Sequence, residues 1–418
     1  MTEPIRVLHF ADTHIGMENY GKTDPQSGLS SRVVDFLHRM DDICKFAQAN
    51  DADLIIFAGD AFKTRAPNPT YQREFAHRIR DLSRIAPVVM LVGNHDLPPT
   101  MLKASSIEIY DTLDVPNVWV ASDYDVYVVE TKRGPVAVGT APYPIRSRLL
   151  EDERTAGLTI AETDALLQEN LTDILEDLAR KAELMNDMPR LLTGHFTVNG
   201  AAVGSERGIM LGRDVAVLLS SVADPRWDYV ALGHVHKHQN LTKGQQGLPP
   251  VVYSGSIERI DFGEEGDPKG FCWIELERGN VNWEFIKLDV RPFVTLSADL
   301  RESDNPTDKV LKLIAKHDLD GAVVRLLLDL SPETEARFNE NTVKDELKRV
   351  GVYQLAGIRK QVEQTVRARL GASPEGLTNA ELLERYFLSK EISSDRRQEL
   401  LNAAEAIFEQ SDGINIDG

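Results

Sequence analysis

Five short polar motifs, each directly after an apolar run, constrain the fold of this chain most strongly. The motifs are Asp12-Thr13-His14, Gly59-Asp60, Gly93-Asn94-His95-Asp96, Gly194-His195 and Gly233-His234-Val235-His236, and the runs before them span Val7–Phe10, Leu54–Phe57, Val88–Val92, Leu191–Leu192 and Tyr229–Leu232. A strand that ends in a loop places its last side chains at the carboxyl edge of a sheet. Five such strands in one sheet would therefore gather these side chains at one place, among them two Asp, one Asn and four His that can bind metal.

This set of side chains suits a pair of metal ions that activates water. Such a centre needs carboxylate and imidazole ligands, one bridging group and an open position for water. Asp60 is the natural bridge because a carboxylate has two oxygens, and Asn94 adds a neutral carbonyl oxygen. Taken singly, an Asp before a helix is more often an N-cap, and a lone His a polar loop residue. The seven together favour a metal site, with the expected ligands Asp12, His14, Asp60, Asn94, His195, His234 and His236.

The hydrophobic pattern over the first part of the chain alternates strands with helices. Helical spacing of apolar residues predicts helices at Arg32–Ala49 and Tyr71–Arg84, short strands follow between Val118 and Val138, and a long acidic helix is expected at Thr163–Met185. Strands that alternate with helices indicate βαβ units and a layered α/β domain. We therefore predict one α/β domain over residues 1–290.

A second pattern begins near Arg291-Pro292. Residues 291–370 read as strand, helix, strand, helix, strand, which indicates a small α+β domain. Residues 371–418 then contain two amphipathic helices after a link at residues 371–376. The first helix opens with a capping box formed by Thr378 and Glu381. The apolar positions are residues 382–387 in the first helix and 400–408 in the second.

Composition narrows the class of protein and its compartment. No apolar run reaches membrane-spanning length, and Met1–Pro4 lead almost directly into the first strand, so we expect no signal peptide and no membrane contact. Cys44 and Cys272 are the two cysteines, which favours a reduced, cytoplasmic protein. The net charge of −19 counts against a non-specific nucleic-acid binder. Two bound divalent ions would reverse the field at the site itself.

The ordered motifs resemble the pattern of the calcineurin-like metallophosphoesterase superfamily, D-x-H, G-D, G-N-H-D/E, G-H and G-H-x-H. The resemblance implies an α/β fold, a four-layer β-sandwich flanked by helices. It implies that Asp12, His14, Asp60 and His236 hold a first ion and that Asp60, Asn94, His195 and His234 hold a second. It also implies that His95 donates a proton to the leaving oxygen or stabilises phosphate charge, and that Asp96 orients the His95 ring.

Longer stretches resemble the SbcD-type nucleases of double-strand-break repair. These stretches are Leu8–Gly16, Gly59–Phe62, His195–Val198 and Val252–Gly263, the last being the most specific to the family. The resemblance implies a homodimeric DNA nuclease, dependent on two divalent ions with Mn²⁺ expected, that cuts duplex ends, single strands and hairpins. It also implies a capping domain and a C-terminal helix pair that docks on an SMC-like ATPase of the SbcC type. Dimer contacts would involve helices near the second and third motifs, at Thr70–Arg84 and Thr100–Leu113.

One position departs from the SbcD pattern. A histidine that places the DNA phosphate stands three residues after the bridging Asp in these nucleases, whereas this chain has Lys63, followed by Arg65. Lysine can bind a phosphate but transfers protons poorly near neutral pH, since its unperturbed pKa is about 10.4. Lys63 and Arg65 are therefore candidate residues for binding phosphate or DNA, and Lys63 is expected to affect the balance of exonuclease to endonuclease activity.

Two other functions are compatible with the same motifs. A phosphodiesterase of small molecules, such as a cyclic nucleotide or a glycerophosphodiester, would use the same dimetal site. A scaffold that has lost its metals would keep only the fold. The long extension beyond residue 290 favours the nuclease over the small-molecule enzyme, and the intact Asp12, Asp60, Asn94 and His95 count against the scaffold.

Overall fold

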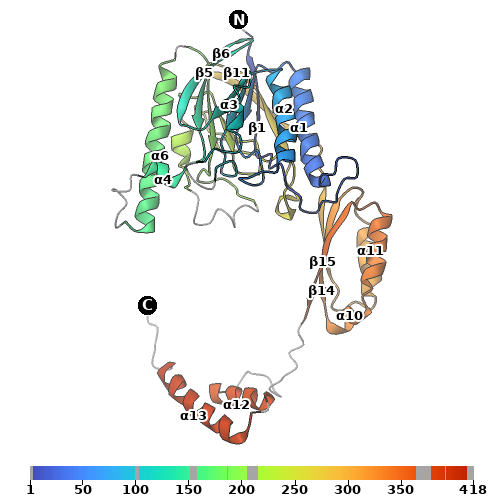
Figure 1. Ribbon diagram of the computed structural model, residues 1–418. Helices are drawn as coiled ribbons and strands as arrows, with labels where there is room; N and C mark the ends of the chain where they lie inside the picture. Colours follow the sequence, from blue (N-terminus) through green and yellow to red (C-terminus); the bar gives the residue numbers. More distant parts are fainter. Residues whose placement is uncertain are drawn as a thin grey trace. The chain divides into compact units, whose positions relative to one another are not determined.

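The computed structural model describes residues 3–98, 103–150, 158–185, 187–204, 215–363, 378–390 and 392–411. The chain divides into two compact units (Figure 1). The first unit holds Met1–Thr295, Asp318–Arg325 and Leu347–Gly357, and the second holds Leu296–His317, Leu326–Glu346 and Ile358–Gly418. The first unit contains all five motifs.

Two six-stranded sheets form the centre of the first unit. One has the order β12-β11-β1-β2-β3-β4 and the other β5-β6-β7-β8-β10-β9. The strands of the first are β1 (Ile5–Phe10), β2 (Leu54–Phe57), β3 (Val88–Leu91), β4 (Val118–Ala121), β11 (Gly270–Glu277) and β12 (Asn280–Lys287). Those of the second are β5 (Asp125–Thr131), β6 (Gly134–Ala141), β7 (Arg190–His195), β8 (Tyr229–Gly233), β9 (Gln239–Asn240) and β10 (Val251–Tyr253).

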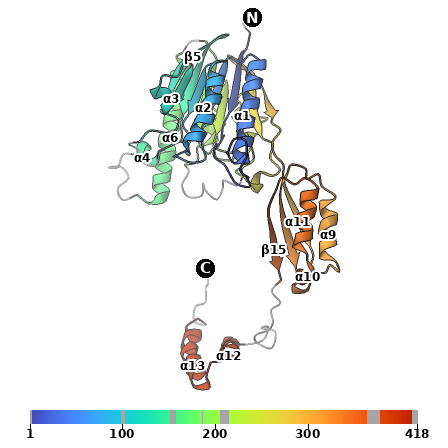
Figure 2. The ribbon, with the colours of Figure 1, turned by 45° about the vertical axis from the view of Figure 1, so that its right-hand side comes forward.

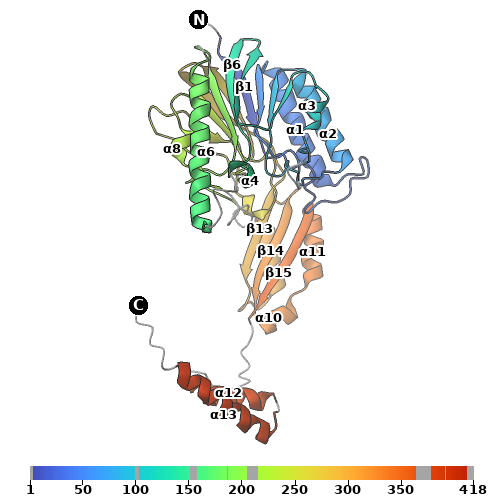
Figure 3. The same cartoon turned by 60° about the vertical axis from the view of Figure 1, so that its left-hand side comes forward.

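The sheets pack face to face, and helices cover their outer faces. Val7, Leu54, Val138 and Leu191 belong to one buried cluster that joins both sheets. The helices α1 (Ser31–Ala49) and α2 (Pro69–Ser83) pack on the first sheet, and α6 (Ile160–Glu183) packs on the second (Figure 3). Shorter helices are α3 (Ile109–Thr112), α4 (Arg146–Leu149), α8 (Leu219–Val222) and the 3-10 turn η1 (Phe262–Glu264). This is the predicted four-layer α/β arrangement.

Residues 293–363 form a small three-stranded sheet with helices. Its strands are β13 (Phe293–Asp299), β14 (Val323–Leu330) and β15 (Gln354–Val362), in that order. The helices are α9 (Pro306–Ile314), α10 (Pro332–Arg337) and α11 (Glu340–Arg349), drawn beside β15 in Figure 2. The predicted succession of strands and helices is present, with α10 as an additional short helix.

Two further helices follow, α12 (Asn379–Ser389) and α13 (Ser394–Ser411). The Thr378 hydroxyl accepts from the Glu381 backbone, and the Glu381 carboxylate accepts from the Thr378 backbone, so the predicted capping box is present. The predicted link at residues 371–376 lies outside the described residues, and the division of the chain at residues 290 and 370 stays a prediction.

Part of the helix expected at 100–113 lies outside the described residues, and residues 103–108 are not helical. Helix α3 covers four residues of the expected helix, and Met101 lies outside the described residues. Ile107 is buried, whereas Ile109 and Leu113 are 51% and 67% exposed. Among the helices that the structure describes, none combines the length and apolar character needed to cross a bilayer.

One detail of the expected architecture was wrong. The five motifs do not follow strands of a single sheet: β1, β2 and β3 belong to the first sheet, and β7 and β8 belong to the second. Each of the two sets is parallel, so each set ends at one edge of its own sheet. Because the sheets are packed face to face, the two edges adjoin and the motifs still meet.

Candidate metal centre

The loops that carry the motifs have unusual backbone conformations. Asp12, His14, Asp60 and His234 have φ of 52°, 39°, 61° and 90°. These are four of the eight described non-glycine residues with positive φ, a region that side chains disfavour. Backbone hydrogen bonds hold two of the loops together, with Asp12 N donating to Gly59 O at 3.0 Å and His14 N donating to Asp60 O at 3.1 Å. Such strain concentrates where side chains must be aimed at a common point.

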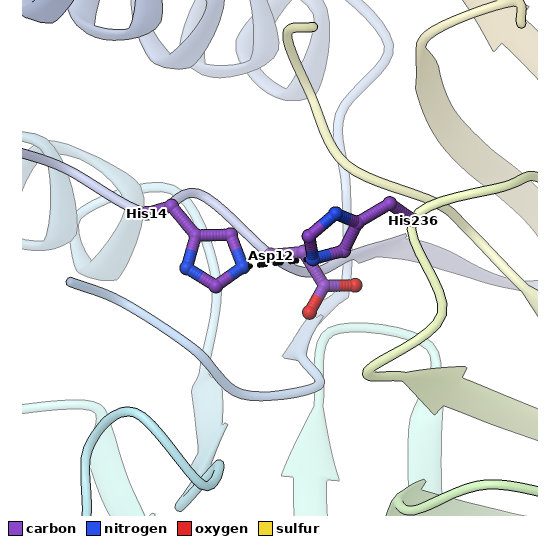
Figure 4. Close-up of side chains that lie close together, drawn as sticks. All are labelled: Asp12, His14 and His236. Carbon is purple, nitrogen blue, oxygen red and sulfur yellow. Dashed lines mark hydrogen bonds between the residues drawn. The ribbon is translucent and has the colours of Figure 1, made fainter. Parts of the chain in front are cut away.

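Asp12, His14 and His236 form the first cluster (Figure 4). One ligand atom from each lies within 4.8 Å of the others. The Nε2 atoms of His14 and His236 are 3.0 Å apart, and their rings meet edge to face. Both Asp12 oxygens accept from His234 N, at 3.0 and 3.1 Å. This contact ties the loop after β1 to the loop after β8.

Asp60, His195 and His234 form a second cluster. His195 Nε2 lies 3.4 Å from Asp60 Oδ2. Asn94 joins this cluster, since its Oδ1 is 3.1 Å from His195 Nε2 and 2.9 Å from His234 Nδ1. Asp60 Oδ2 also lies 3.7 Å from His14 Nε2, so Asp60 stands between the two clusters, where a bridging carboxylate would stand.

The donor set fits a hard divalent cation. His195 Nδ1 donates to Ala58 O at 2.6 Å, which leaves the Nε2 lone pair facing the oxygens of Asn94 and Asp60. Three electron-rich atoms that converge repel one another unless a cation lies among them. A proton can take that part: burial alone would lower the pKa of His195, but the Asp60 and Asp12 charges raise it to about 9. Carboxylate, amide and imidazole ligands suit manganese, iron or zinc.

The pKa values of Asp60 and His14 also fit a metal centre. Burial alone would raise the pKa of Asp60, but the neighbouring His195 and His95 outweigh it and hold that pKa well below its ordinary value. Asp60 is therefore a carboxylate. For His14, burial is the dominant effect and lowers its pKa well below the ordinary value, so its ring is neutral and can bind a metal.

The role expected for Asp96 was wrong. The His95 ring is held by a backbone carbonyl instead, with Nδ1 2.8 Å from Lys63 O. The buried Asp96 carboxylate accepts from the backbone N–H groups of Gly93, Asp60 and Ala61 at 2.9–3.1 Å. A carboxylate in a loop prefers several nearby N–H donors to one distant ring. Asp96 thus fastens the loop of Asp60 to the loop of Asn94 and His95.

His95 itself lies at the edge of the first cluster. Its backbone N–H donates to Asp60 Oδ1 at 2.8 Å, and its ring is 4.9 Å from the His14 ring, edge to face. Lys63 is half-buried on the loop after β2, close enough for its charge to influence His14, while Arg65 is exposed.

Two buried residues at the site were not predicted from the sequence. Glu264 accepts from His236 Nδ1 at 2.9 Å, and Lys269 pairs with Glu264 at 2.8 Å. The attraction of Lys269 and His236 outweighs burial and holds the pKa of Glu264 at about 2. Both residues lie just after the family-specific stretch that ends at Gly263. That position was the available signal, but a Glu beside Glu265 looks like a surface residue.

Similarity to known proteins shows the family to which this chain belongs. The family model described as calcineurin-like phosphoesterase matches residues 5–238, more than half of the chain. This chain belongs to the calcineurin-like phosphoesterase family. The two clusters are thus the candidate dimetal centre of a calcineurin-like phosphoesterase, and the expectation of a phosphoester hydrolase with divalent metals is confirmed.

Curated relatives of this phosphoesterase include proteins named as the SbcD subunit of nuclease SbcCD. The one from Escherichia coli K12 is 28% identical over 71% of this chain and 72% of its own. The one from Rhodobacter capsulatus is 27% identical over 66% and 67%, and the one from Bacillus subtilis 26% over 68% and 70%. The resemblance to SbcD-type nucleases is thereby confirmed. Among solved structures, a dimetal phosphatase from Danio rerio aligns over 68% of this chain and 96% of its own, with 10% identity and a TM-score of 0.41.

Proposed function

We propose that this phosphoesterase is a metal-dependent DNA nuclease, the nuclease subunit of an SbcCD-like complex. Its activity would include exonuclease action on duplex ends and endonuclease action on single strands and hairpins. The observation that carries the proposal is the similarity to SbcD nucleases across about two-thirds or more of both chains. The convergence of the seven predicted ligands into two clusters that share Asp60 supports it.

In this proposal the two clusters hold two divalent ions, with Mn²⁺ expected. The first ion would be held by Asp12, His14, Asp60 and His236, and the second by Asp60, Asn94, His195 and His234. Ions bound there supply a nucleophilic water at neutral pH and neutralise phosphate charge. The positive φ values and loop hydrogen bonds keep these side chains aimed at one place before substrate arrives.

His95 is the proposed acid for the leaving oxygen. The Lys63 carbonyl accepts from Nδ1, so the ring is held in one orientation and Nε2 is the nitrogen available to the substrate. A proton on Nε2 can pass to the oxygen that departs from phosphorus, which avoids the release of an alkoxide. Asp96 acts at a distance from the substrate, by holding the loops of Asp60 and His95 together.

The first test compares substrates in the presence of Mn²⁺. We expect the purified protein to cut linear DNA, and we expect Lys63→Ala to raise KM for DNA several-fold while changing hydrolysis of a small aryl phosphodiester little. The reason is that the proposed role of the Lys63 side chain is to contact the DNA backbone, whereas its backbone carbonyl, which holds His95, survives the substitution. Steady-state kinetics on both substrates provide the measurement.

Lys132→Ala is the matched control, because Lys132 pairs with Asp51 and Ala52 O outside the metal centre. Lys132→Ala should leave the kinetics on DNA and on the aryl phosphodiester unchanged. Equal losses on both substrates in Lys63→Ala would contradict the assignment of Lys63. Turnover confined to a cyclic nucleotide or a glycerophosphodiester would replace the nuclease with a small-molecule phosphodiesterase.

The helices α12 and α13 are the proposed docking site for an SMC-like ATPase of the SbcC type. Tyr386 and Leu388 on α12 are 50% and 52% exposed, a large apolar surface for so short a helix. The relatives are named as subunits of SbcCD, which places them in a complex with another chain. We also propose a homodimer that uses the surface of α2 and the exposed Ile109 and Leu113. The proposed location of the protein is the cytoplasm.

Deletion of residues 376–418 should abolish co-purification of a coiled-coil ATPase with this protein. Nuclease activity of the isolated chain on single-stranded DNA should remain, because all the candidate ligands lie before residue 240. Deletion of residues 412–418 alone is the control and should leave the complex intact. An ATPase that still co-purifies with the longer deletion would contradict this docking site.

A further inference from the structure

The stretch most specific to the SbcD-type nucleases, Val252–Gly263, contributes no candidate metal ligand. Residues within it and just after it nevertheless contact the candidate ligand His236. Within residues 254–269, Glu264 and Lys269 are both 0% exposed. They lie in the same compact unit as His236, the ligand after β8. Burying two charges costs free energy of desolvation even when they are paired and hydrogen-bonded. A functional role would explain why this pair is buried beside His236.

Glu264 contacts the His236 ring on the side away from the first cluster. Glu264 Oε1 is 2.9 Å from His236 Nδ1, while His236 Nε2 lies 3.0 Å from His14 Nε2. A carboxylate accepts hydrogen bonds only, so Nδ1 carries the proton. The Nε2 lone pair is then directed into the cluster.

Lys269 holds the same residue by its backbone. Its Nζ donates to His236 O at 2.9 Å and to Ser256 Oγ at 2.8 Å, and it pairs with Glu264 Oε2 at 2.8 Å. Ser256 N donates to the same His236 carbonyl at 3.1 Å. The Glu264–Lys269 ion pair therefore holds both the ring and the main chain of His236 through hydrogen bonds.

We propose that Glu264 and Lys269 are positioning residues for the first metal, which select the Nδ1–H tautomer of His236 and fix its ring so that Nε2 is the ligand atom. This inference rests on the metal centre of the proposed function and is independent of whether the substrate is DNA. A carboxylate behind a metal-binding histidine orients the ring and raises the basicity of the ligand nitrogen.

The hydrogen bonds of Glu264 show why a carboxylate is required. Oε2 accepts from Ile260 N at 2.9 Å as well as from Lys269, and Oε1 accepts from His236. Glutamine has the same shape but only one acceptor oxygen. Its oxygen would face Ile260 and the Lys269 ammonium, and its NH₂ group would face His236 Nδ1. His236 would then carry its proton on Nε2, where it blocks the metal.

The test is a Mn²⁺ titration of the full-length Glu264→Gln protein by calorimetry. We expect one of the two sites to bind about 10- to 100-fold more weakly and the other to be unchanged. The weakened site should be the one that His236→Gln loses, and the double variant should be no weaker than His236→Gln. Glu265→Gln is the matched control, because Glu265 accepts from Thr295 N at 2.8 Å and Thr295 Oγ1 at 2.5 Å. Two sites that keep the wild-type affinity within twofold in folded Glu264→Gln would overturn the proposal.

A measurement on the wild-type protein covers the case in which Glu264→Gln does not fold. Long-range ¹H–¹⁵N spectra of the metal-free protein at pH 8 report the tautomer of each histidine, and the His236→Gln variant assigns the resonance. We expect a proton on Nδ1 of His236; a proton on Nε2 would overturn the proposal. Wild-type protein that binds two Mn²⁺ but does not cut DNA would contradict the nuclease and leave this inference standing.

Discussion

Replacing Asp60 with Asn is expected to lower kcat/KM for DNA cleavage by at least about 1000-fold, a larger loss than the roughly 10- to 100-fold typical of residues behind the ligands. Asp60 lies within reach of ligands from both clusters, with Oδ2 3.4 Å from His195 Nε2 and 3.7 Å from His14 Nε2. Asparagine keeps the shape and can still accept from His95 N, but it removes the shared charge. Bound metal, measured by elemental analysis, should fall in parallel with activity.

Asp228→Asn is the matched control for Asp60→Asn. Asp228 is also buried, and it stands just before β8, at the opposite end of that strand from His234. Its carboxylate accepts from Arg190 N and Gly279 N, both at 2.8 Å. The variant should lose about 1–3 kcal/mol of unfolding free energy, because one donor is left unpaired, and it should keep its metal. An Asp60→Asn protein with full metal content and activity would rule out Asp60 as the bridge.

Replacing His95 with Ala is expected to lower kcat for DNA cleavage by about 100- to 10,000-fold without loss of bound metal. The ring would be removed from a site that its Nδ1 contact with Lys63 O defines, while the backbone N–H that donates to Asp60 Oδ1 would remain. The bridge therefore keeps its geometry. Because the proposed role of His95 is that of an acid, hydrolysis of an aryl diester with a p-nitrophenolate leaving group should suffer a much smaller loss.

The matched control is His38→Ala, because His38 is exposed on α1. It should leave both kinetics and metal content unchanged. Equal losses on DNA and on the aryl diester would assign His95 to stabilisation of phosphate charge, not to proton donation. Loss of one bound ion in His95→Ala would make His95 a metal ligand and contradict the assignment.

Much of the architecture followed from short-range patterns. The helices expected at Arg32–Ala49 and Thr163–Met185 are α1 and α6, within a few residues at each end. Apolar spacing predicts such helices well because burial of one face stabilises them. Residues 103–113 were predicted poorly as part of a helix: their apolar residues do not lie on one helical face, since Ile107 is buried and Ile109 exposed.

The sequence alone identified the seven candidate ligands, His95 and the class of chemistry, because strand ends and side-chain types are local properties that survive as motifs. Only the tertiary structure showed that the motifs come from two sheets and that Lys63 O, not Asp96, holds the His95 ring. It also showed that Glu264 and Lys269 contact His236 on the side away from the first cluster. These contacts join segments separated by 28 or more positions and depend on which backbone groups meet after packing. No local pattern carries that information, so hydrogen-bond partners around a site emerge only when the sheets are in place.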